Sequence, residues 1–475
     1  MTVDGWIRHE VVIVCDQSNL DAMPISRSLR SIGRQRSSWL ILLGAGGAAT
    51  AIALASPSLG LPSSSSSAIS DSPKEVIDQV WQIVYRDYLD STGKYNPEDW
   101  KGLRKDLLAK NYSATSESYE AIRGMLASLD DPYTRFLDPK EFKEMQIDTS
   151  GELTGVGIQL SLDKDTKELV VVSPIEGTPA SKAGVQPKDV IVFINGQSTK
   201  GMSTADAVKL IRGKEGSEVT LGLRRKGSVI QVPLIRARIE IQAVDQQLNT
   251  TVDGTKIGYI RLKQFNAHAA KGMRSAIKNL ENEGAQGYVL DLRSNPGGLL
   301  EASVDIARQW LDEGTIVRTK TRDGIQDVRR ANGSALTKRP VVVLVNEGSA
   351  SASEILSGAL QDNHRGVLVG QKTFGKGLVQ SVRGLSDGSG LTVTIAKYLT
   401  PSGTDIHKNG IEPDVKAVMS EKEIKNLNLE DLGSGKDSQY KVAETTLIKA
   451  LKKVLDGTFY NPVGVNLSYA LQSSV

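Results

Sequence analysis

The chain has 475 residues, 39% hydrophobic and 24% charged, which is the composition of a globular protein and enough length for about three domains. Its 58 Lys and Arg against 55 Asp and Glu leave a net charge of +3, so nucleic acid is not an expected partner. The single cysteine, Cys15, excludes an internal disulfide, a cysteine-based zinc site and an iron–sulfur cluster. The four histidines form no His-Glu-x-x-His pair, and we expect neither a metal nor another cofactor.

The N-terminal region carries the pattern of an export signal. Residues 23–38 contain four arginines and no acidic residue, residues 39–55 are mostly apolar, and Ser, Pro and Gly dominate up to residue 72. A basic flank, an apolar run and a small-x-small ending are typical of a cleaved signal peptide. An apolar run of about 17 residues could instead remain as a membrane anchor. Met23 stands just before the basic flank, so translation could start there, and Cys15 would then not belong to the protein.

The next region is predicted to be helical. Between Val76 and Val84, apolar residues recur at helical spacing, and the pattern continues in residues 74–148. The segment 129–139 interrupts these helices, because proline cannot continue a helix. It contains two adjacent carboxylates, Asp130 and Asp131, which could be interpreted as an acid–base pair. Neighbouring aspartates before a proline are more typical of turns and caps.

From Gly151 the pattern changes to about six short strands and one helix, which indicates a compact β-rich module. The module resembles a PDZ domain in the loop Gly155-Val156-Gly157-Ile158, the turn Pro179–Val185 and the run Lys188–Gly196. This resemblance implies that the C-terminus of a ligand adds as an extra strand beside Ile158 to Leu160, while backbone N–H groups of the loop hold its carboxylate. Leu160 stands where a GxGxxG nucleotide loop needs its third glycine, which excludes that interpretation.

Beyond residue 256, predicted strands and helices alternate, which indicates α/β layers. The expected strands are Ile257–Phe265, Tyr288–Arg293, Thr315–Thr319, Pro340–Asn346 and Val367–Gly370, and the expected helices are Ala267–Glu283, Leu299–Trp310 and Ala352–Gln361. Two more strands, Leu378–Val382 and Leu391–Tyr398, and a last helix, Ser438–Leu455, follow. The fold class is therefore a multidomain α/β and α+β protein.

Three polar segments come at the ends of predicted strands, Asp291–Gly298, Asn346–Glu354 and Thr373–Gln380. Ligands of α/β sheets bind outside the carboxyl ends of the strands, so we expect these loops to converge on one site. The third segment nearly spells a phosphate-binding Walker A loop. Gly377, however, stands where that loop needs Ser or Thr, and the run continues into a strand, which excludes a phosphate loop.

Within these segments, Ser351 stands between alanines where a strand gives way to a helix. Its hydroxyl is therefore open, and the N–H groups at the helix start can face an oxyanion. A serine nucleophile needs a base; His364 lies too far along the same helix, whereas Lys376 between two glycines can serve. The lysine must then be neutral, which requires burial to lower its pKa by roughly 3 from about 10.4. Taken alone, a serine in the place of Ser351 is more typical of a helix N-cap, and the alternative for Lys376 is a surface lysine in a turn.

The chain resembles the carboxyl-terminal processing proteases, also called tail-specific proteases. The resemblance runs from about Val76 to Val415 and rests on the segment Leu129–Phe136, the PDZ-like module and the three polar segments. It implies that Ser351 is the nucleophile, Lys376 the general base, Gln380 the residue that orients this lysine and Glu354 a support of the site. The implied oxyanion hole consists of the N–H of Ala352 and that of either Gly297 or Gly298.

Two short segments, Val84–Tyr88 and Lys397–Pro401, resemble the plant and cyanobacterial branch of this family, which acts in the thylakoid lumen on the photosystem II reaction-centre precursor. The resemblance implies a serine endopeptidase of the lumen or periplasm that removes C-terminal segments from exported proteins with free, largely apolar tails. It would meet a membrane only through its signal or an uncleaved anchor. The alternative is an inactive protein that binds tails through its PDZ domain, but an inert protein would have little reason to carry Ser351, Lys376 and Gln380 together.

The expected domains are an export signal and Ser-rich linker (1–72), a helical region (73–150), a PDZ domain (151–236), an α/β protease core (237–420) and a helical C-terminal segment (421–475). Because the joints of the PDZ domain are short, we expect it to move as a rigid body and to gate the catalytic site. Arg212 follows the helix beside the expected peptide groove and is the candidate sensor of a bound tail. The alternative for Arg212 is a solvated cation at a helix end.

Overall fold

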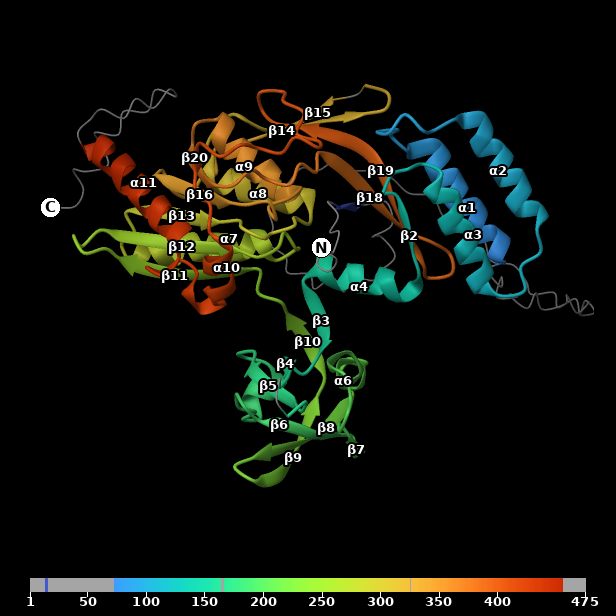
Figure 1. Cartoon of the computed structure of the whole chain (residues 1–475), viewed down its shortest axis with the longest axis horizontal. Coiled ribbons are helices and arrows are strands. Elements are labelled where there is room, and N and C mark those ends of the chain that lie inside the picture. The colour runs from blue at the N-terminus through green and yellow to red at the C-terminus, as the bar shows by residue number, and fades with distance from the viewer. Residues whose placement is uncertain (1–12, 16–71, 164–165, 325, 456–475) are drawn as a thin grey trace, which may run out of the picture.

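The computed structural model describes residues 13–15, 72–163, 166–324 and 326–455 (Figure 1). The apolar run at 39–55, on which the export signal or anchor was predicted, lies outside these residues. Within the described ranges, no helix combines the length and the apolar character needed to cross a membrane. Figure 1 shows a wide upper body that contains two sheets and most helices, and a smaller β-rich module below it.

The N-terminal helices begin as their sequences predict. The helices are α1 (Pro73–Asp87), α2 (Pro97–Ala109), α3 (Thr115–Ala127) and α4 (Pro139–Ser150). Three of them start with a proline behind a capping side chain, Ser72, Asn96 or Asp138, because proline fits the first turn and a short polar side chain accepts its N–H groups. The predicted break is confirmed, but it holds an unexpected short strand, β2 (Arg135–Leu137).

The lower module is connected to the upper body by a two-stranded stalk. Strand β3 (Glu152–Gly155) pairs antiparallel with β10 (Ala237–Glu240), and the module lies between them in the sequence (Figure 1). Its sheet has the order β4 (Ile158–Leu162), β5 (Leu169–Pro174), β6 (Val190–Ile194), β8 (Glu218–Arg225) and β9 (Ser228–Ile235), with β7 (Gln197–Ser198) beside β6 and the helices α5 (Pro179–Lys182) and α6 (Thr204–Ile211). Strand β4 is an edge of this sheet, so one side of its backbone is open to a further strand.

The larger sheet of the upper body confirms the predicted α/β layers. Its order is β11 (Val244–Thr250), β12 (Lys256–Leu262), β13 (Gly287–Asp291), β16 (Val341–Val345), β17 (Gly366–Gly370) and β20 (Val415–Lys416), and all but β11 run parallel. Helices α7 (Ala269–Asn282), α8 (Leu300–Trp310) and α9 (Ala352–Asp362) cover one face, and α11 (Ser438–Leu455) covers the other.

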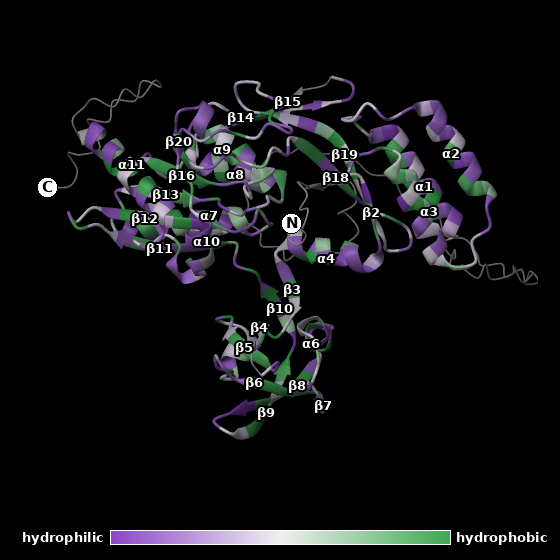
Figure 2. Ribbon diagram, viewed as in Figure 1, coloured by the Kyte–Doolittle hydropathy of each residue, from purple (hydrophilic) through white to green (hydrophobic). Residues whose placement is uncertain are grey.

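Burial on both faces explains why the strands of this sheet are almost continuously apolar. In β13, Leu290 packs toward α7, α8 and α9, while its neighbour Val289 packs toward α11. In β16, Val343 likewise packs toward α7, α8 and α9, and its neighbour Leu344 packs toward α11. Figure 2 shows the resulting concentration of hydrophobic residues along these strands. Such runs are typical of parallel sheets that helices cover on both sides.

A second sheet was not anticipated. It joins β14 (Thr315–Thr321), β15 (Gln326–Arg330), β18 (Leu378–Gly384) and β19 (Gly390–Leu399), with β2 beside β19 and β1 (Ile13–Cys15) parallel to β18. The strand predicted at 315–319 therefore does not continue the parallel sheet; it forms an antiparallel hairpin with β15 and pairs with β19. Strand β2 attaches the N-terminal helices here, where Leu391 and Val393 pack into their core.

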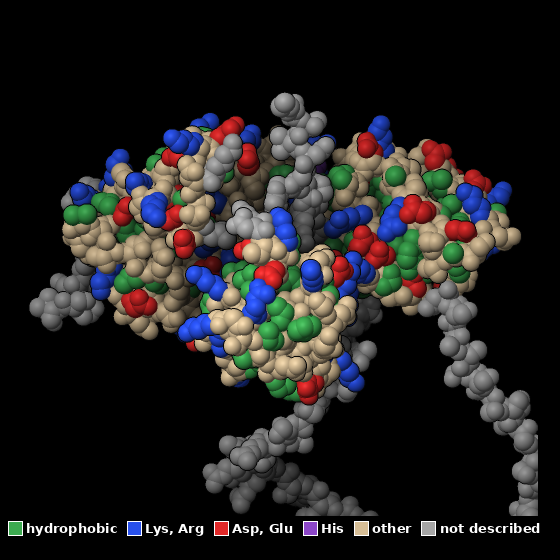
Figure 3. Space-filling view, turned by 60° about the horizontal axis from the view of Figure 1, so that its bottom comes forward, with side chains coloured by type: hydrophobic (Ala, Val, Ile, Leu, Met, Phe, Trp, Pro, Cys, Tyr) green, Lys and Arg blue, Asp and Glu red, His purple; other side chains and the backbone are tan. Residues whose placement is uncertain are grey.

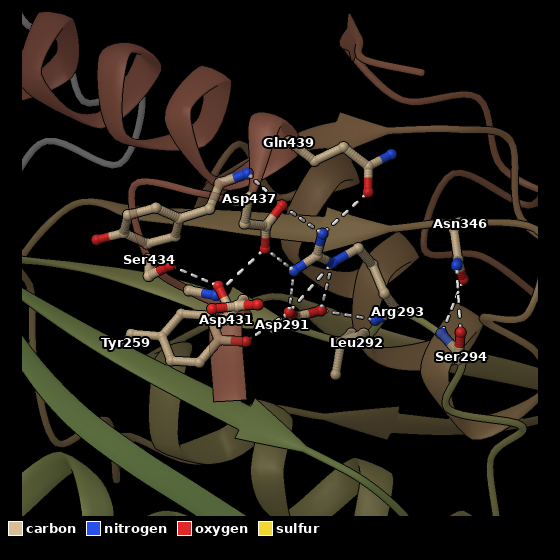
Figure 4. A network of polar contacts seen from close by, with 12 residues as sticks. Tyr259, Asp291, Leu292, Arg293, Ser294, Asn346, Asp431, Ser434, Asp437 and Gln439 are labelled. Atoms are coloured by element: carbon tan, nitrogen blue, oxygen red, sulfur yellow. Dashed lines mark hydrogen bonds and ion pairs between the residues drawn. The ribbon is translucent and has the colours of Figure 1, made fainter. Parts of the chain in front are cut away.

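The C-terminal region is anchored to the end of β13 by a buried ionic network (Figure 4). Arg293 bonds Asp291 at 2.5 Å and Asp437 at 2.6 Å through the same guanidinium nitrogen, and Gln439 accepts a further bond at 3.0 Å. Tyr259 completes the network by donating to Asp291 at 2.7 Å. Burial alone would raise the pKa of Asp437, but the hydrogen bonds from Arg293 hold it below its usual value. The predicted helix at 438–455 is confirmed, and a short α10 (Glu421–Asn426) precedes it.

This network predicts a large stability loss for Asp437→Asn. The free energy of unfolding in urea should fall by about 3 kcal/mol at neutral pH, because the substitution leaves part of a buried guanidinium charge unpaired. Because folding lowers the pKa of Asp437, its contribution is present above the unfolded-state value of about 3.9 and is lost as pH falls through the folded value. The matched control is Asp305→Asn in an exposed pair with Arg308, expected to cost under about 1 kcal/mol. Equal losses in both variants would contradict the anchoring role.

Candidate active site

The three polar segments meet at one edge of the parallel sheet, as the strand-end argument predicted. The N–H of Ala350 and the hydroxyl of Ser353 both donate to the carbonyl oxygen of Asn295, at 3.1 and 2.8 Å. The side chain of Asn346 accepts the N–H of Ser294 at 2.8 Å, as Figure 4 shows at its right edge. These bonds join the first segment to the second.

Ser351 occupies the N-cap position of α9 in a strained backbone conformation. Its φ is +61° and its ψ is −114°, which only glycine adopts readily. The side chain is fully buried, and its Oγ has no hydrogen-bond partner among the described residues. The hydroxyl therefore does not cap the helix, although a serine at this position usually does.

Glu354 takes over the capping role and joins the second segment to the third. Its Oε2 accepts the N–H of Ser351 at 2.8 Å and that of Lys376 at 2.9 Å. Its Oε1 accepts the N–H of Gly375 at 2.7 Å and the hydroxyl of Thr373 at 2.5 Å. Burial raises the pKa of Glu354, and these four hydrogen bonds oppose the rise. One carboxylate thus fixes the backbone of both candidate catalytic residues.

Tyr398 forms a second bridge between the same loops. Its hydroxyl donates toward the carbonyl oxygen of Ser351 at 3.0 Å and also contacts the carbonyl oxygen of Lys376. The side chain is buried, and burial, together with the nearby charge of Glu354, raises its pKa well above the usual value. Tyr398 therefore stays a neutral donor over the whole physiological pH range.

Lys376 is nearly as buried as Ser351. Its relative exposure is 2%, and its Nζ lies 4.8 Å from the ring centroid of Tyr133. The flanking glycines are needed because the loop packs tightly. A Cβ at Gly375 would lie 2.8 Å from the backbone nitrogen of Gly410, and one at Gly377 would lie 2.7 Å from that of His407. The interpretation of Lys376 as a surface lysine is therefore wrong.

Gln380, the next predicted site residue, is also fully buried, on strand β18. Its Nε2 lies 3.4 Å from the hydroxyl oxygen of Thr394, whereas its Oε1 has no hydrogen-bond partner among the described residues. Thr394 lies on β19, the neighbouring strand of the second sheet. The second sheet therefore supplies one wall of the site.

The two glycines considered for the oxyanion hole differ in their surroundings. A Cβ at Gly297 would lie 2.9 Å from Ser351 Cβ and 3.0 Å from the nitrogen of Ala352, so this glycine lies directly against the serine. Its N–H, however, donates to the side chain of Asn295 at 3.0 Å. Among the hydrogen bonds of the described residues, none uses the N–H of Gly298 or of Ala352 as donor.

The lower module has the features that peptide capture needs. The loop Gly155-Val156-Gly157-Ile158 leads into the edge strand β4, and α6 packs beside that strand. Gly157 has φ +78°, and a Cβ there would lie 2.4 Å from Thr178, so only glycine fits. Arg212 is the C-cap of α6, with its Cγ 4.0 Å from the Cβ position of Gly155. The predicted sensor thus lies beside the loop that would bind a carboxylate.

This module also exposes hydrophobic side chains. Val172, Phe193, Val229 and Ile235 are each more than 40% exposed. Figure 3, in which the module comes forward, shows hydrophobic side chains gathered on its surface.

Several residues around the site were not recognised as site residues from the sequence. Tyr133, Thr373, Thr394 and Tyr398 all contact the candidate catalytic residues or their supports. Three of the four lie in segments that carry the family resemblance. For these three, their place in a segment that resembles the family was the only available signal. Thr394 gave none, because the contacts of all four join parts of the chain that are far apart in sequence.

Comparisons with known proteins point to one family. Residues 256–417 match peptidase family S41, and residues 170–225 match the PDZ domain family. A carboxyl-terminal-processing protease of Synechocystis is 48% identical over 343 residues, which cover 72% of this chain and 80% of the relative. The chain belongs to the carboxyl-terminal processing proteases of peptidase family S41. It is therefore a serine peptidase, and the alternative of an inactive tail-binding protein is not favoured.

Other relatives of this protease come from chloroplasts and bacteria. The chloroplastic C-terminal processing peptidase of Tetradesmus obliquus is 40% identical over 353 residues, which cover 71% of this chain and 76% of the relative. The protease CtpA of Bacillus subtilis is 40% identical over 352 residues, or 74% of this chain and 73% of the relative. A solved structure named photosystem II D1 C-terminal processing protease is 40% identical, covers 73% of this chain and 93% of its own, and has a TM-score of 0.48.

The bridging carboxylate predicts a severe effect of Glu354→Gln. A glutamine has only one acceptor oxygen, so it cannot accept the four hydrogen bonds that fix the two loops. We expect kcat/KM to fall by about 100-fold, since small displacements of reacting groups cost this much. Steady-state cleavage of an unstructured protein measures the effect. The matched control, Glu347→Gln, changes an exposed carboxylate of the same loop and should leave kcat/KM unchanged. Near-normal cleavage by Glu354→Gln would contradict the bridge.

Proposed function

We propose that this protease cleaves protein tails by Ser–Lys chemistry, with Ser351 as nucleophile and Lys376 as base. One observation carries the proposal. The buried carboxylate of Glu354 accepts the N–H groups of both residues, while the hydroxyl of Ser351 is left without a hydrogen-bond partner in the described part of the chain. An unengaged hydroxyl and a buried amine held by one support are what a serine–lysine pair requires.

The reaction follows from these positions. Lys376, buried and therefore disfavoured as an ammonium, accepts the proton of Ser351 as its Oγ attacks the scissile carbonyl carbon. The N–H groups of Ala352 and Gly298 stabilise the oxyanion; Gly298 is favoured over Gly297 because the N–H of Gly297 already bonds Asn295. Lys376 then gives the proton to the leaving amine. In the second half, it takes a proton from the water that attacks the acyl carbonyl, and it returns this proton to the Oγ of Ser351 as the bond to the acyl group breaks.

The PDZ domain, with the expected bounds 151–236, selects the substrate. A free tail adds to the edge strand β4, and its carboxylate accepts N–H groups of residues 155–158. The partly buried apolar side chains Ile158, Leu160 and Leu210 line this part of the module and favour an apolar tail. Arg212 lies beside the same loop and is the candidate that senses occupancy. The substrate is therefore an exported protein with a free, largely apolar C-terminus.

The physiological substrate that we propose is the photosystem II reaction-centre precursor. The support is the solved relative named photosystem II D1 C-terminal processing protease and the chloroplastic origin of several sequence relatives. The corresponding compartment is the thylakoid lumen, or the periplasm for another exported substrate, reached through the signal predicted before residue 73. A membrane contact would be limited to that signal or an uncleaved anchor.

The variant Lys376→Arg tests whether Lys376 acts by accepting a proton or only through its positive charge. Arginine keeps the charge but does not deprotonate near neutral pH, so cleavage should fall nearly as far as in Lys376→Ala, by about 10³-fold or more. Ser351→Ala should be equally inactive, and wild-type activity should decline toward acid pH as Lys376 takes up a proton. Cleavage of an apolar-tailed protein, followed by mass spectrometry, measures each variant. An arginine variant with near-wild-type turnover, or an active Ser351→Ala, would refute the assigned roles.

Amidating the substrate tests recognition of the free carboxylate. Loss of the charge-assisted hydrogen bonds to residues 155–158 should lower kcat/KM about 10-fold or more. A variant in which a Gly-Ser bridge replaces residues 152–235 should cleave free and amidated substrates alike, with residual or raised activity. Equal processing of both substrates by the wild type would discard tail capture. A folded but inactive deletion variant would instead mean that the PDZ domain helps to assemble the catalytic site.

A further inference from the structure

A chain of hydrogen bonds connects the segment before β2 to Gln380. Asp131, only 6% exposed, accepts the hydroxyl of Thr394 at 2.7 Å and that of Thr134 at 2.8 Å, both with Oδ2. Its Oδ1 accepts the N–H of Tyr133 at 3.0 Å. Thr394 in turn lies 3.4 Å from Nε2 of Gln380. A residue of the N-terminal region therefore reaches the catalytic centre through one intermediate.

The hydrogens in this chain can run in only one direction. A carboxylate has no hydrogen to give, so the single hydroxyl hydrogen of Thr394 is committed to Asp131. Thr134 cannot supply another acceptor for the hydroxyl hydrogen of Thr394. Its own hydroxyl donates to Asp131 and accepts the N–H of Thr394 at 3.0 Å. Toward Gln380, Thr394 presents a lone pair, which only the NH₂ end of the amide can satisfy.

The orientation of the Gln380 amide follows. With its nitrogen held by Thr394, its oxygen points away, and that oxygen is the buried atom without a hydrogen-bond partner among the described residues. In the orienting role that the family resemblance implies for Gln380, this oxygen accepts an N–H of the Lys376 amine and leaves the amine lone pair for the proton of Ser351. A reversed amide would donate to that lone pair and block the base.

We propose that Asp131 is a positioning residue for catalysis, which fixes the orientation of the Gln380 amide through Thr394. The inference rests on the role proposed for Lys376 and on the orienting role that the family resemblance implies for Gln380. The same short segment supplies a second constraint, since the Tyr133 ring faces the Nζ of Lys376 at 4.8 Å. The neighbouring Asp130 is exposed, with φ +53°, and has a turn role only.

Asp131→Asn tests the inference because it reverses the chain with little change in shape. Asparagine can still accept the N–H of Tyr133, but its NH₂ group donates to Thr394, whose hydrogen then turns toward Gln380 and rotates the amide. We expect kcat to fall by about 10- to 100-fold with KM nearly unchanged, a part of the 10²- to 10⁴-fold that a general base supplies. Asp130→Asn is the matched control and should behave as the wild type. Thermal unfolding and circular dichroism establish that both variants fold.

The pH dependence of kcat separates orientation from simple electrostatics. Among the described residues, the titratable groups around Lys376 are Glu354 from α9, Tyr133 and Asp131 from the segment before β2, and Tyr398 and His407 from β19 and the loop after it. Removing the charge of Asp131 disfavours the ammonium form of Lys376, which moves the acid limb to lower pH. A purely electrostatic role would move this limb and leave the high-pH plateau of kcat intact. The orientation role requires the plateau itself to fall.

Thr394→Val provides an independent variant that keeps the charge of Asp131. It should lower the plateau as well, and the double variant Asp131→Asn/Thr394→Val should lose no more than the larger single loss, because both act through one path. Additive losses, or a normal plateau in Asp131→Asn, would overturn the inference. Gln380→Ala identifies which claim has failed. If Gln380→Ala is impaired but Asp131→Asn is normal, only the positioning role of Asp131 is rejected. If Gln380→Ala is fully active, the role of Gln380 is rejected and the role of Asp131 with it.

Discussion

The catalytic geometry depends on one buried carboxylate. Glu354 lies in the first turn of α9, and it accepts hydrogen bonds from the backbone of Ser351 on one side and of Lys376 and Gly375 on the other. Because these donors are backbone N–H groups, the relative position of the two loops does not depend on the rotamers of the Ser351 and Lys376 side chains. The energetic cost of burying a carboxylate, visible in its raised pKa, is offset by four donors.

The same interaction explains why the hydroxyl of a serine in a helix-capping pattern is left without a partner among the described residues, as the proposed nucleophile role requires. The sequence Ser351-Ala352-Ser353-Glu354 has the form of a capping box, and local rules assign the hydroxyl to the helix N–H groups. Here only the glutamate half of the box forms, and the positive φ of Ser351 turns its hydroxyl away from the helix. The rest of the structure must sustain this strain, which is a common feature of functional sites.

How much could be predicted from the sequence follows from the range of the interactions involved. Helix α11, the strands of the parallel sheet and the convergence of three loops could be predicted, because apolar periodicity and strand ends are local signals. The second sheet could not, since β14 pairs with β19 about 80 residues away and its pattern resembles that of any half-buried strand. Asp131 was interpreted as a turn residue, which is correct for its bond to Tyr133 but misses Thr394, 263 positions away.

The contacts at the base of the PDZ stalk offer a route by which the proposed tail binding can act on catalysis. At the base of the PDZ stalk, Glu152 contacts His268 at 3.1 Å, close to the point where the N–H of Ala267 bonds Thr149. Two residues earlier, Phe265 donates its N–H to Gly297 and forms a bridge with Gly298, the favoured oxyanion donor. The N-terminal helices and α11 are held to the upper body by buried cores, whereas the PDZ module is joined through two strands. A rotation of that module can therefore reach Gly297 and Gly298 through these few non-covalent contacts and the short run of chain from Phe265 to His268, and the proposed gate needs no longer route than this.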